Sequence, residues 1–359
     1  LTPGTVAILE DTHRVAIAQV AVNPESKIAA RVLTRDPDAV VGREWLAARL
    51  ERAKALRDTL YDTPFYRLIH AEADGFPGVI ADRFGETIVL QPNAAWAEVM
   101  LDDFVAILSD LDGVRHIQKS ASGRARKLEG LDDTDMVLLG DPPSRVDVVM
   151  NEATYIADLA SGQKTGLFFD QRPNHAFAAR LAKNARVLDV FSHVGGFALA
   201  TLAGGAKTAL AVDASEAALT LARDGANASG VADRFQTQRG DAFHVLDSLG
   251  SEKARFDIVI CDPPAFAPSR STLQAGLRAY ERVARLAAPL VAPGGALLLC
   301  SCSHAAELSK FRNACVRGIG RAGREAQIIW TGGAGPDHPL HPQLGESGYL
   351  KALGFRMLS

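Results

Sequence analysis

Runs of apolar residues that each end in a small group of polar residues recur in the second half of the chain. They cover residues 186–190, 209–212, 256–261 and 296–299, with a further strand predicted just before Arg239. Helical patterns fill the gaps, so the chain repeats strand, helix, strand, which predicts a parallel sheet packed against helices. Ligands of such sheets bind beyond the carboxyl ends of the strands, where these polar groups fall. The pattern therefore predicts an α/β fold with a binding site at that edge.

Shorter elements precede this sheet. Residues 1–42 predict small strands that form part of a β-barrel, and residues 43–63 predict a helical linker. Residues 64–160 place strands on both sides of one amphipathic helix over 96–111, which is typical of an α+β layer. Residues 161–359 hold the parallel sheet. We therefore expect an α/β protein with a partial N-terminal barrel and an α+β middle domain.

Composition and charge narrow the class of protein. The 359 residues are 47% hydrophobic and 23% charged, which is ordinary for a soluble globular protein of two or three domains. The net charge of -3 argues against a strongly basic nucleic-acid binder but leaves local basic patches open. The longest apolar run is too short to span a bilayer. Four cysteines without metal or disulfide spacing predict a reducing cytoplasm.

The turn after the first strand of the sheet indicates the type of cofactor. A dinucleotide-binding unit has G-x-G-x-x-G directly after that strand, whereas here Gly195 and Gly196 are separated from Asp189 by a bulky turn. A pyrophosphate would lack its close backbone approach, which disfavours a dinucleotide oxidoreductase. S-adenosylmethionine carries no phosphate and needs only a turn around its amino-acid end and an acid for its ribose. This cofactor therefore fits the pattern better.

Two acids follow the next strands. Asp213 suits the ribose hydroxyls as a two-oxygen acceptor, and Asp241 could accept from the adenine amino group. The alternative for each is a structural role as the N-cap of the helix that follows. For Asp241 both roles can coexist.

Asp262, Pro263 and Pro264 come directly after the fourth strand. Two prolines fix the backbone in an extended turn and hold the carboxylate rigidly at the sheet edge. A planar base or amide could be gripped there. The alternative is a tight turn without function.

Cys302 lies in a Ser-Cys-Ser-His loop just past the fifth strand, flanked by hydroxyl groups, whereas Cys261, Cys300 and Cys315 read as buried apolar residues. A thiolate that adds to carbon 6 of cytosine makes carbon 5 enamine-like and able to attack a methyl group. A protonated Asp262 at N3 of the base would stabilise the developing charge. Such an acid needs a raised pKa, and the thiol needs activation by its surroundings.

Taken together, these residues resemble the class I S-adenosylmethionine-dependent methyltransferases of the bacterial large-subunit (23S) ribosomal RNA cytosine-5 type. The resemblance covers nearly the whole chain, and its most specific motifs are the segment 162–172 and the loop 301–303. The motifs are G-Q-K-T-G at 162–166 with D-Q-R at 170–172, F-S-H-V-G-G-F at 191–197, D-P-P-A-F at 262–266, S-C-S at 301–303, and H-P at 338–339 with G-Y-L-K at 348–351.

The resemblance implies a PUA barrel, an α+β domain and a Rossmann-like domain that binds S-adenosylmethionine. Residues 1–42 match only the second half of that barrel. Cys302 carries over as the nucleophile and Asp262 as the acid that grips the base, beside Pro263 and Pro264. The implied cofactor contacts are Phe191, Ser192, Gly195, Asp213, Asp241 and Ala242, with Gln171 and Arg172 as weaker candidates. The implied partner is large-subunit ribosomal RNA, and the family resemblance also suggests a homodimer.

Basic residues that could contact RNA fall in two places. Lys119, Arg124, Arg126 and Lys127 are predicted to form a loop cluster, which we favour because Gly and Ser beside it can follow a backbone. Arg278, Arg282 and Arg285 share one helix face. Each group could equally be a solvated charged surface. A base must leave its stack to meet a buried thiol, so an unpaired cytosine is expected.

Two alternatives remain open at this point. The acceptor could be an exocyclic amine of RNA or a protein side chain, which needs no thiol, and full activity of Cys302→Ala would favour this. The chain could also be a non-catalytic RNA-binding module, for which loss of S-adenosylmethionine binding with RNA binding intact would be evidence.

Overall fold

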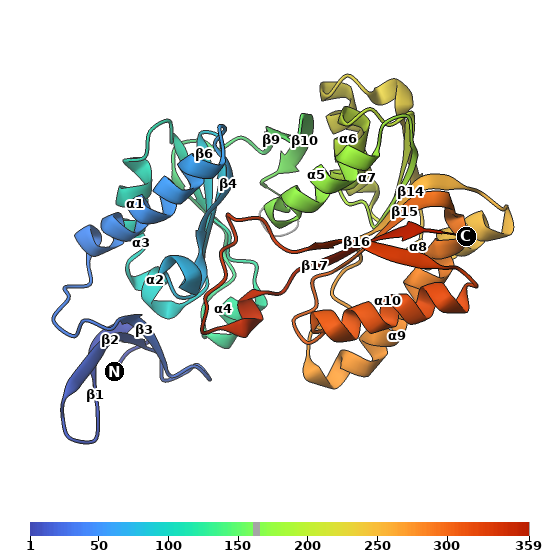
Figure 1. The fold of residues 1–359 in the computed structure, drawn as a ribbon. Helices are drawn as coiled ribbons and strands as arrows, with labels where there is room; N and C mark the ends of the chain where they lie inside the picture. The colour runs from blue at the N-terminus through green and yellow to red at the C-terminus, as the bar shows by residue number, and fades with distance from the viewer. Residues whose placement is uncertain (161–165, 359) are drawn as a thin grey trace. The chain divides into compact units, whose positions relative to one another are not determined.

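The computed structural model describes residues 1–160 and 166–358 (Figure 1). The chain divides into two compact units. The first comprises Leu1–Val146, Asp158–Phe169 and Pro336–Gln343, and the second Asp147–Ala157, Asp170–Gly335 and Leu344–Ser359. Within the described residues, no helix is long and apolar enough to cross a membrane.

A small antiparallel sheet opens the first unit. It consists of β1 (Thr5–Glu10), β2 (Ala16–Val22) and β3 (Ala30–Thr34) in that order. The Asp11 carboxylate holds the turn between β1 and β2 by accepting hydrogen bonds from the backbone N–H groups of His13 and Val15, at 2.8 and 2.9 Å. The short strands predicted for this part of the chain are therefore present.

A five-stranded sheet follows, with α1 (Arg43–Leu60) before it. Its strands, in spatial order, are β4 (Phe65–His70), β5 (Val79–Phe84), β6 (Thr87–Pro92), β7 (His116–Lys119) and β8 (Met136–Leu139). The predicted helix over 96–111 is two helices, α2 (Ala95–Val99) and α3 (Leu101–Ser109), which meet at Met100. Leu46 of α1 and Phe104 of α3 pack with strand residues such as Ile88 in one core. This is the α+β layer that the alternation of strands and helix predicts.

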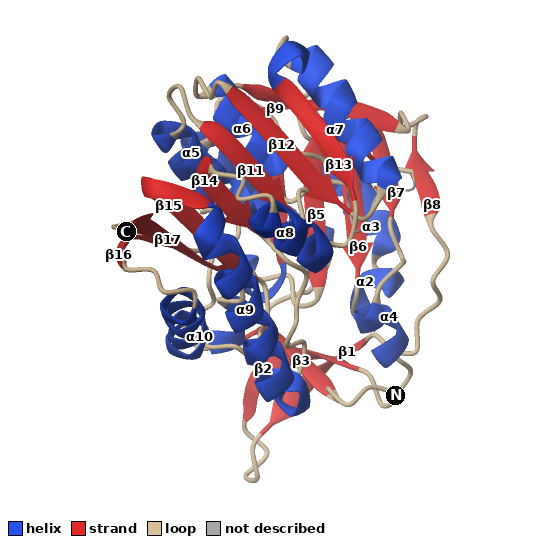
Figure 2. Cartoon of the chain, turned by 90° about the vertical axis from the view of Figure 1, so that its right-hand side faces the viewer, coloured by secondary structure: helices blue, strands red, loops and turns tan. Residues whose placement is uncertain are grey.

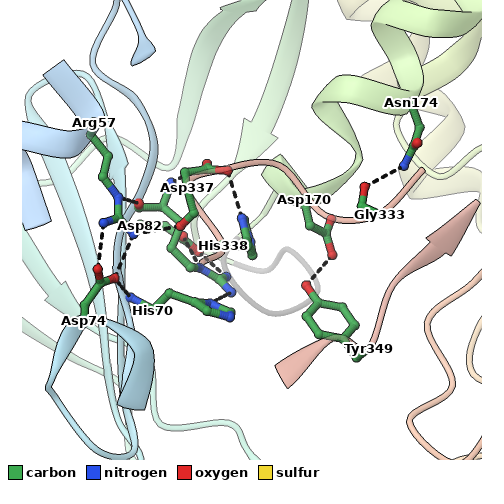
Figure 3. A network of polar contacts seen from close by, with 11 residues as sticks. Arg57, His70, Asp74, Asp82, Asp170, Asn174, Gly333, Asp337, His338 and Tyr349 are labelled. Carbon is green, nitrogen blue, oxygen red and sulfur yellow. Dashed lines mark hydrogen bonds and ion pairs between the residues drawn. The ribbon is translucent and has the colours of Figure 1, made fainter. Parts of the chain in front are cut away.

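The segment Pro336–Gln343 belongs to the first unit through a buried polar network (Figure 3). Arg57 pairs with Asp74 at 2.7 Å and donates to the carbonyl of Asp337 at 2.8 Å. The Asp337 carboxylate accepts from the backbone N–H of Arg67 at 3.0 Å and contacts His338 at 2.9 Å. A buried guanidinium is stable only with such partners, so this loop is a fixed part of the unit.

The second unit is built on a seven-stranded sheet with the order β13-β12-β11-β14-β15-β17-β16 (Figure 2). The strands are β11 (Arg186–Val190), β12 (Thr208–Asp213), β13 (Phe235–Arg239), β14 (Phe256–Cys261), β15 (Val291–Ser301), β16 (Ala326–Gly332) and β17 (Lys351–Met357). Strands β11 to β15 run parallel, as predicted, whereas β17 pairs antiparallel with both β15 and β16.

Helices cover both faces of this sheet (Figure 2). One face carries α5 (Arg172–Leu181), α6 (Gly196–Ala203) and α7 (Glu216–Ala228), and the other carries α8 (Ala242–Ser251), α9 (Leu273–Ala287) and α10 (Leu308–Arg321). Leu246, Val283 and Phe311 of the second group pack with strand residues in one continuous core. The strands of such a three-layer fold are buried on both faces, which explains their apolar runs.

The hairpin of β9 (Arg145–Met150) and β10 (Ala153–Asp158) differs from its predicted place. We expected it in the α+β layer that ends at residue 160, but most of it packs in the second unit. The backbone N–H of Thr154 donates to the Ser229 hydroxyl at 2.8 Å, and the Tyr155 hydroxyl donates to the Gly196 carbonyl at 3.2 Å. Tertiary hydrogen bonds decide its place, and these are not visible in a strand pattern.

Candidate functional site

The turn after β11 has an unusual backbone. Phe191, His193 and Gly195 have φ angles of 63°, 49° and 79°, in the left-handed region that costs energy for residues with a side chain. The Ser192 N–H donates to the Val212 carbonyl at 3.0 Å, and Gly195 is the N-cap of α6. The turn is therefore held between two strand ends and leads into a helix N-terminus, as a cradle for a ligand requires.

Asp213, at the end of β12, is fixed by two backbone donors. Its carboxylate accepts from the N–H groups of His193 at 2.8 Å and Ser215 at 2.9 Å. Ser215, not Asp213, is the N-cap of α7, since its hydroxyl accepts from the N–H of Ala218 at 3.2 Å. The capping alternative for Asp213 is therefore not what the structure shows. The half-buried carboxylate stays rigid next to the turn after β11.

Asp241 has the capping role that was its structural alternative. Its exposed carboxylate accepts from the N–H of His244 at 3.0 Å at the start of α8, and Ala242, the first residue of that helix, is buried. Contact with an adenine remains a prediction for this residue.

Three half-buried aromatic rings line the same edge of the sheet. Phe191 lies 6.3 Å from both Phe243 and Phe266, and the latter two are 6.1 Å apart, measured between ring centroids. The guanidinium of Arg282 lies 4.6 Å from the centre of the Phe243 ring. Sequence reasoning missed Phe243 and Phe266 as site residues. The available signal was that each comes two residues after a strand-end motif, Phe243 after Asp241 and Phe266 after Pro264.

Two buried polar atoms test whether S-adenosylmethionine fits here. Ser192 Oγ and Asp189 Oδ1 have no hydrogen-bond partner among the described residues. Burial raises the pKa of the Asp189 carboxyl to about 8, and the charges of Asp262 and Asp213 act in the same direction. Since buried polar atoms are normally paired, these two suit the ammonium and carboxylate of an amino-acid group. The residues present therefore fit this cofactor.

Asp262 is oriented by a chain of side-chain amides. Trp330 donates to Asn174 at 3.0 Å, Asn174 donates to Gln171 at 2.7 Å, and Gln171 donates to Asp262 Oδ2 at 2.8 Å. Asn174 also donates to the carbonyl of Gly333, as Figure 3 shows. We expected Gln171 to contact the cofactor, but its buried amide nitrogen is used on Asp262. Arg172, the first residue of α5, is half-buried.

The loop with Cys302 is held by its two serines. The Tyr280 hydroxyl of α9 lies 2.7 Å from Ser303 Oγ and accepts from Ser301 Oγ at 2.9 Å. Ser303 Oγ also accepts from the N–H of Ala267 at 2.9 Å, which ties this loop to the one with the two prolines. Both serines are fully buried, whereas Cys302 between them is half-buried.

The remaining cysteines are buried, as the sequence predicts, and burial raises the pKa of the Cys261, Cys300 and Cys315 thiols. Cys302 and Asp262 follow the carboxyl ends of neighbouring parallel strands, β15 and β14. Of the two prolines, Pro263 is buried and Pro264 exposed. The structure therefore brings the thiol and the acid to one edge of the sheet, together with Asp213 and the turn after β11.

The predicted loop cluster of basic residues is different in the structure. Lys119 ends β7 and Arg126 lies in α4 (Arg124–Leu128); they are 4% and 0% exposed. Both pair with Glu98, at 2.7 and 2.8 Å. Lys127 is exposed, 3.8 Å from Asp133, and lines a surface hollow with Ser122 and Gly123. Arg124 begins α4. Burial and acidic neighbours thus remove Lys119 and Arg126 from any RNA-facing surface.

The second basic group lies on one exposed helix face, which fits both an RNA contact and a solvated surface. Arg278, Arg282 and Arg285 are exposed on α9, opposite the buried face that holds Tyr280. Within the described residues none of the three has an ion-pair partner.

The motif at 162–166 lies outside the described residues, except for Gly166.

Comparison with known proteins agrees with this site. A family model described as S-adenosylmethionine-dependent methyltransferase matches residues 118–356. The ribosomal RNA large subunit methyltransferase I of Erwinia tasmaniensis is 34% identical over 99% of this chain and 91% of its own. That of Aeromonas hydrophila is 36% identical over 95% of this chain and 87% of its own.

Solved structures agree with the fold. A complex of SMU.776 with SAH, described as a methyltransferase, has a TM-score of 0.85 at 19% identity and covers 99% of this chain and 92% of that one. A protein from Streptococcus mutans described as a SAM-dependent methyltransferase gives 0.84 at 19% identity, with the same coverage. The order of the strands, a site whose residues fit S-adenosylmethionine, and a sequence similarity that extends over nearly the full length all agree. The chain belongs to the S-adenosylmethionine-dependent methyltransferases, in the family of the ribosomal RNA large subunit methyltransferases I.

Proposed function

We propose that this protein methylates carbon 5 of a cytosine in large-subunit ribosomal RNA through a covalent intermediate with Cys302. The names of its relatives support ribosomal RNA as the substrate. One observation carries the choice of cytosine: Cys302 is only half-buried beyond β15, beside the strand that Asp262 follows, while the other three cysteines are buried. Methylation of an amine would need no thiol at this place.

The chain's own residues would act as follows. The Cys302 thiolate donates an electron pair to carbon 6 and forms an S–C6 bond, while Asp262 donates a proton to N3 and neutralises the charge that develops there. Carbon 5 becomes enamine-like, and S-adenosylmethionine supplies the methyl group as an electrophile. A base, for which solvent water suffices, then takes the carbon 5 proton, the C–H electron pair re-forms the C5–C6 double bond, and the S–C6 bond breaks to return the sulfur as a thiolate. N3 gives its proton back to the Asp262 carboxylate.

The amide chain positions one oxygen of Asp262. Gln171 donates to Oδ2, so that oxygen acts as an acceptor toward this amide. Asn174 accepts from Trp330 through its oxygen and donates to Gln171 through its nitrogen, which fixes both amide orientations. Gln171 would therefore position the acid rather than bind the cofactor.

Binding roles follow from the same edge of the sheet. Phe191, Ser192 and Gly195 would hold the amino-acid end of the cofactor, Asp213 its ribose, and Asp241 with Ala242 its adenine, beside the rings of Phe243 and Phe266. Pro263 and Pro264 would shape the base pocket. For RNA phosphates we favour the α9 arginines, because they are exposed and lie on the helix that holds the Cys302 loop. Lys127 and Arg124 remain secondary candidates, and a homodimer is a further proposal.

RNA that contains 5-fluorocytosine tests the mechanism, because fluorine at carbon 5 blocks release of the enzyme. The wild-type protein is expected to form a covalent complex that resists denaturation, and Cys302→Ser to form none. Cys315→Ala, which alters a buried thiol, is the matched control and should trap RNA normally. Mass mapping of ribosomal RNA from a strain without the protein would identify the nucleotide.

Two results would contradict this proposal. Full methyl transfer by Cys302→Ala would show that the acceptor is an amine or a protein side chain. Absence of S-adenosylmethionine binding in calorimetry, with RNA binding intact, would indicate a non-catalytic module.

A further inference from the structure

Lys351 is a buried cation next to the Cys302 loop. It begins β17, directly opposite Ser301 of β15 in the antiparallel register, and is 7% exposed. Its ammonium donates to the carbonyl of Ser303 at 2.6 Å. Lysine is almost never buried without a charged partner or a function. A single neutral carbonyl is a poor reason to bury this charge.

The charge on Lys351 is coupled to the sulfur. Burial lowers the pKa of the Lys351 ammonium to about 8, and the negative charge of a Cys302 thiolate acts in the opposite direction. The two groups are therefore within electrostatic reach, as expected for residues that flank the same carbonyl. Each ionised form favours the other.

Among the described residues, the other titratable groups placed near this loop are an acid, a phenol and a histidine. Asp262 lies beyond the neighbouring strand, and the Tyr280 hydroxyl of α9 is bonded to both serines. His304, the next residue but one, lies 5.4 Å from the ring of Tyr349, whose hydroxyl donates to Asp170 at 2.5 Å (Figure 3).

We propose that Lys351 is a positioning residue of the methyl-transfer site, whose ammonium, anchored on the Ser303 carbonyl, stabilises the thiolate of Cys302. As a statement about catalysis this rests on the proposed role of Cys302. The charge pairing itself is a property of the free protein. A purely structural lysine would brace the loop equally well with Cys302 protonated or ionised.

The experiment measures alkylation of Cys302 by iodoacetamide as a function of pH, with the modified residue identified by peptide mass spectrometry. Cys261, Cys300 and Cys315 are buried and should stay unmodified in the folded protein. Lys351→Met keeps the length of the side chain without its charge. It is expected to raise the pH at which the rate of Cys302 alkylation is half-maximal, the alkylation midpoint, by about 1 pH unit or more. Lys351→Arg keeps the charge and is expected to leave the midpoint at or below the wild-type value.

Lys207→Met is the matched control. Lys207 is exposed just before β12, at the opposite edge of the sheet from Cys302, so the same loss of charge there should not move the midpoint. Calorimetric binding of S-adenosylmethionine verifies that each variant is folded. Below the midpoint, Lys351→Met should also trap fluorinated RNA about tenfold more slowly, since each pH unit changes the thiolate fraction tenfold.

An unchanged alkylation midpoint in folded Lys351→Met would overturn the inference. The failure of the proposed function would look different. If the wild type does not trap fluorinated RNA but Lys351→Met still shifts the midpoint, the charge pairing holds and the cytosine mechanism fails. If the wild type traps RNA and Lys351→Met has the wild-type midpoint, the mechanism holds and Lys351 is structural.

Discussion

The sequence predicted functional sites in two groups of charged residues, and the structure shows that the two groups differ in their partners. Around α4, Lys119 and Arg126 are buried and pair with Glu98, and Asp132 lies 3.8 and 3.6 Å from them. At the carboxyl edge of the seven-stranded sheet, Asp213 and Asp262 are half-buried, and Asp189 nearby keeps an oxygen without a hydrogen-bond partner among the described residues. The cations around α4 are held by acidic neighbours and stabilise the fold, whereas the unpaired buried oxygen of Asp189 at the sheet edge is suited to a ligand.

Replacement of the acid should have the largest effect at the sheet edge. Asp262→Asn cannot deliver a proton, so we expect the rate of methyl transfer to fall about 100-fold or more, the range usual for general acids. Single-turnover kinetics at saturating RNA measure it. Gln171→Leu removes the donor to Oδ2 and the acceptor of Asn174 but leaves the acid in place, so it should cost less. Equal losses in both variants would show that orientation, not proton transfer, is the role of this carboxyl.

Around α4 the corresponding change should affect stability instead. Arg126→Met leaves Glu98 without one of its partners, and breaking a buried ion pair costs about 3–5 kcal/mol of unfolding free energy. Urea denaturation monitored by circular dichroism measures this loss. Lys127→Gln, on the exposed side of the same helix, is the control and should change little. Weaker RNA binding by folded Arg126→Met would contradict the distinction between the two groups.

Acid should destabilise the protein through buried histidines. Burial, aided by the charges of His338, Arg67 and Arg57, lowers the pKa of His70 to about 3. The unfolded chain therefore binds the proton first, and stability that is complete above pH 6.5 is lost as the pH falls toward 3. His70 alone should cost about 2 kcal/mol at pH 5. His70→Gln should flatten the pH profile of unfolding, and the exposed His13→Gln should not.

The smallest effect concerns RNA phosphates. Arg282→Gln should weaken RNA binding a few-fold and reduce the slope of log affinity against log salt by about 1, since roughly one counterion is released per phosphate contact. Filter binding across a salt series measures it. Lys127→Gln serves as the comparison, and a larger change there than in Arg282→Gln would restore the α4 surface as the RNA contact.

The two groups also show what a sequence can predict. The ends of the strands can be predicted, because apolar runs indicate parallel strands. The topology then brings the carboxyl ends of these strands to one edge of the sheet. The positions of Asp213, Asp262 and Cys302 followed from that alone. Whether a charged side chain is exposed or buried in an ion pair cannot be predicted from the sequence in the same way. Lys119 and Arg126 depend on Glu98, more than 20 residues away, and no local pattern indicates that pairing.

The amino-acid sequence by itself determined the α/β fold, the cofactor class and the family, since periodicity and short motifs are local properties that survive without coordinates. The tertiary structure decided how the site is held. It showed that Gln171 donates to Asp262, that Tyr280 and Ser303 join two loops, and that Lys351 from the last strand donates to the carbonyl of Ser303 in the Cys302 loop. These contacts join residues far apart in the chain, and their geometry arises only when the strands pair.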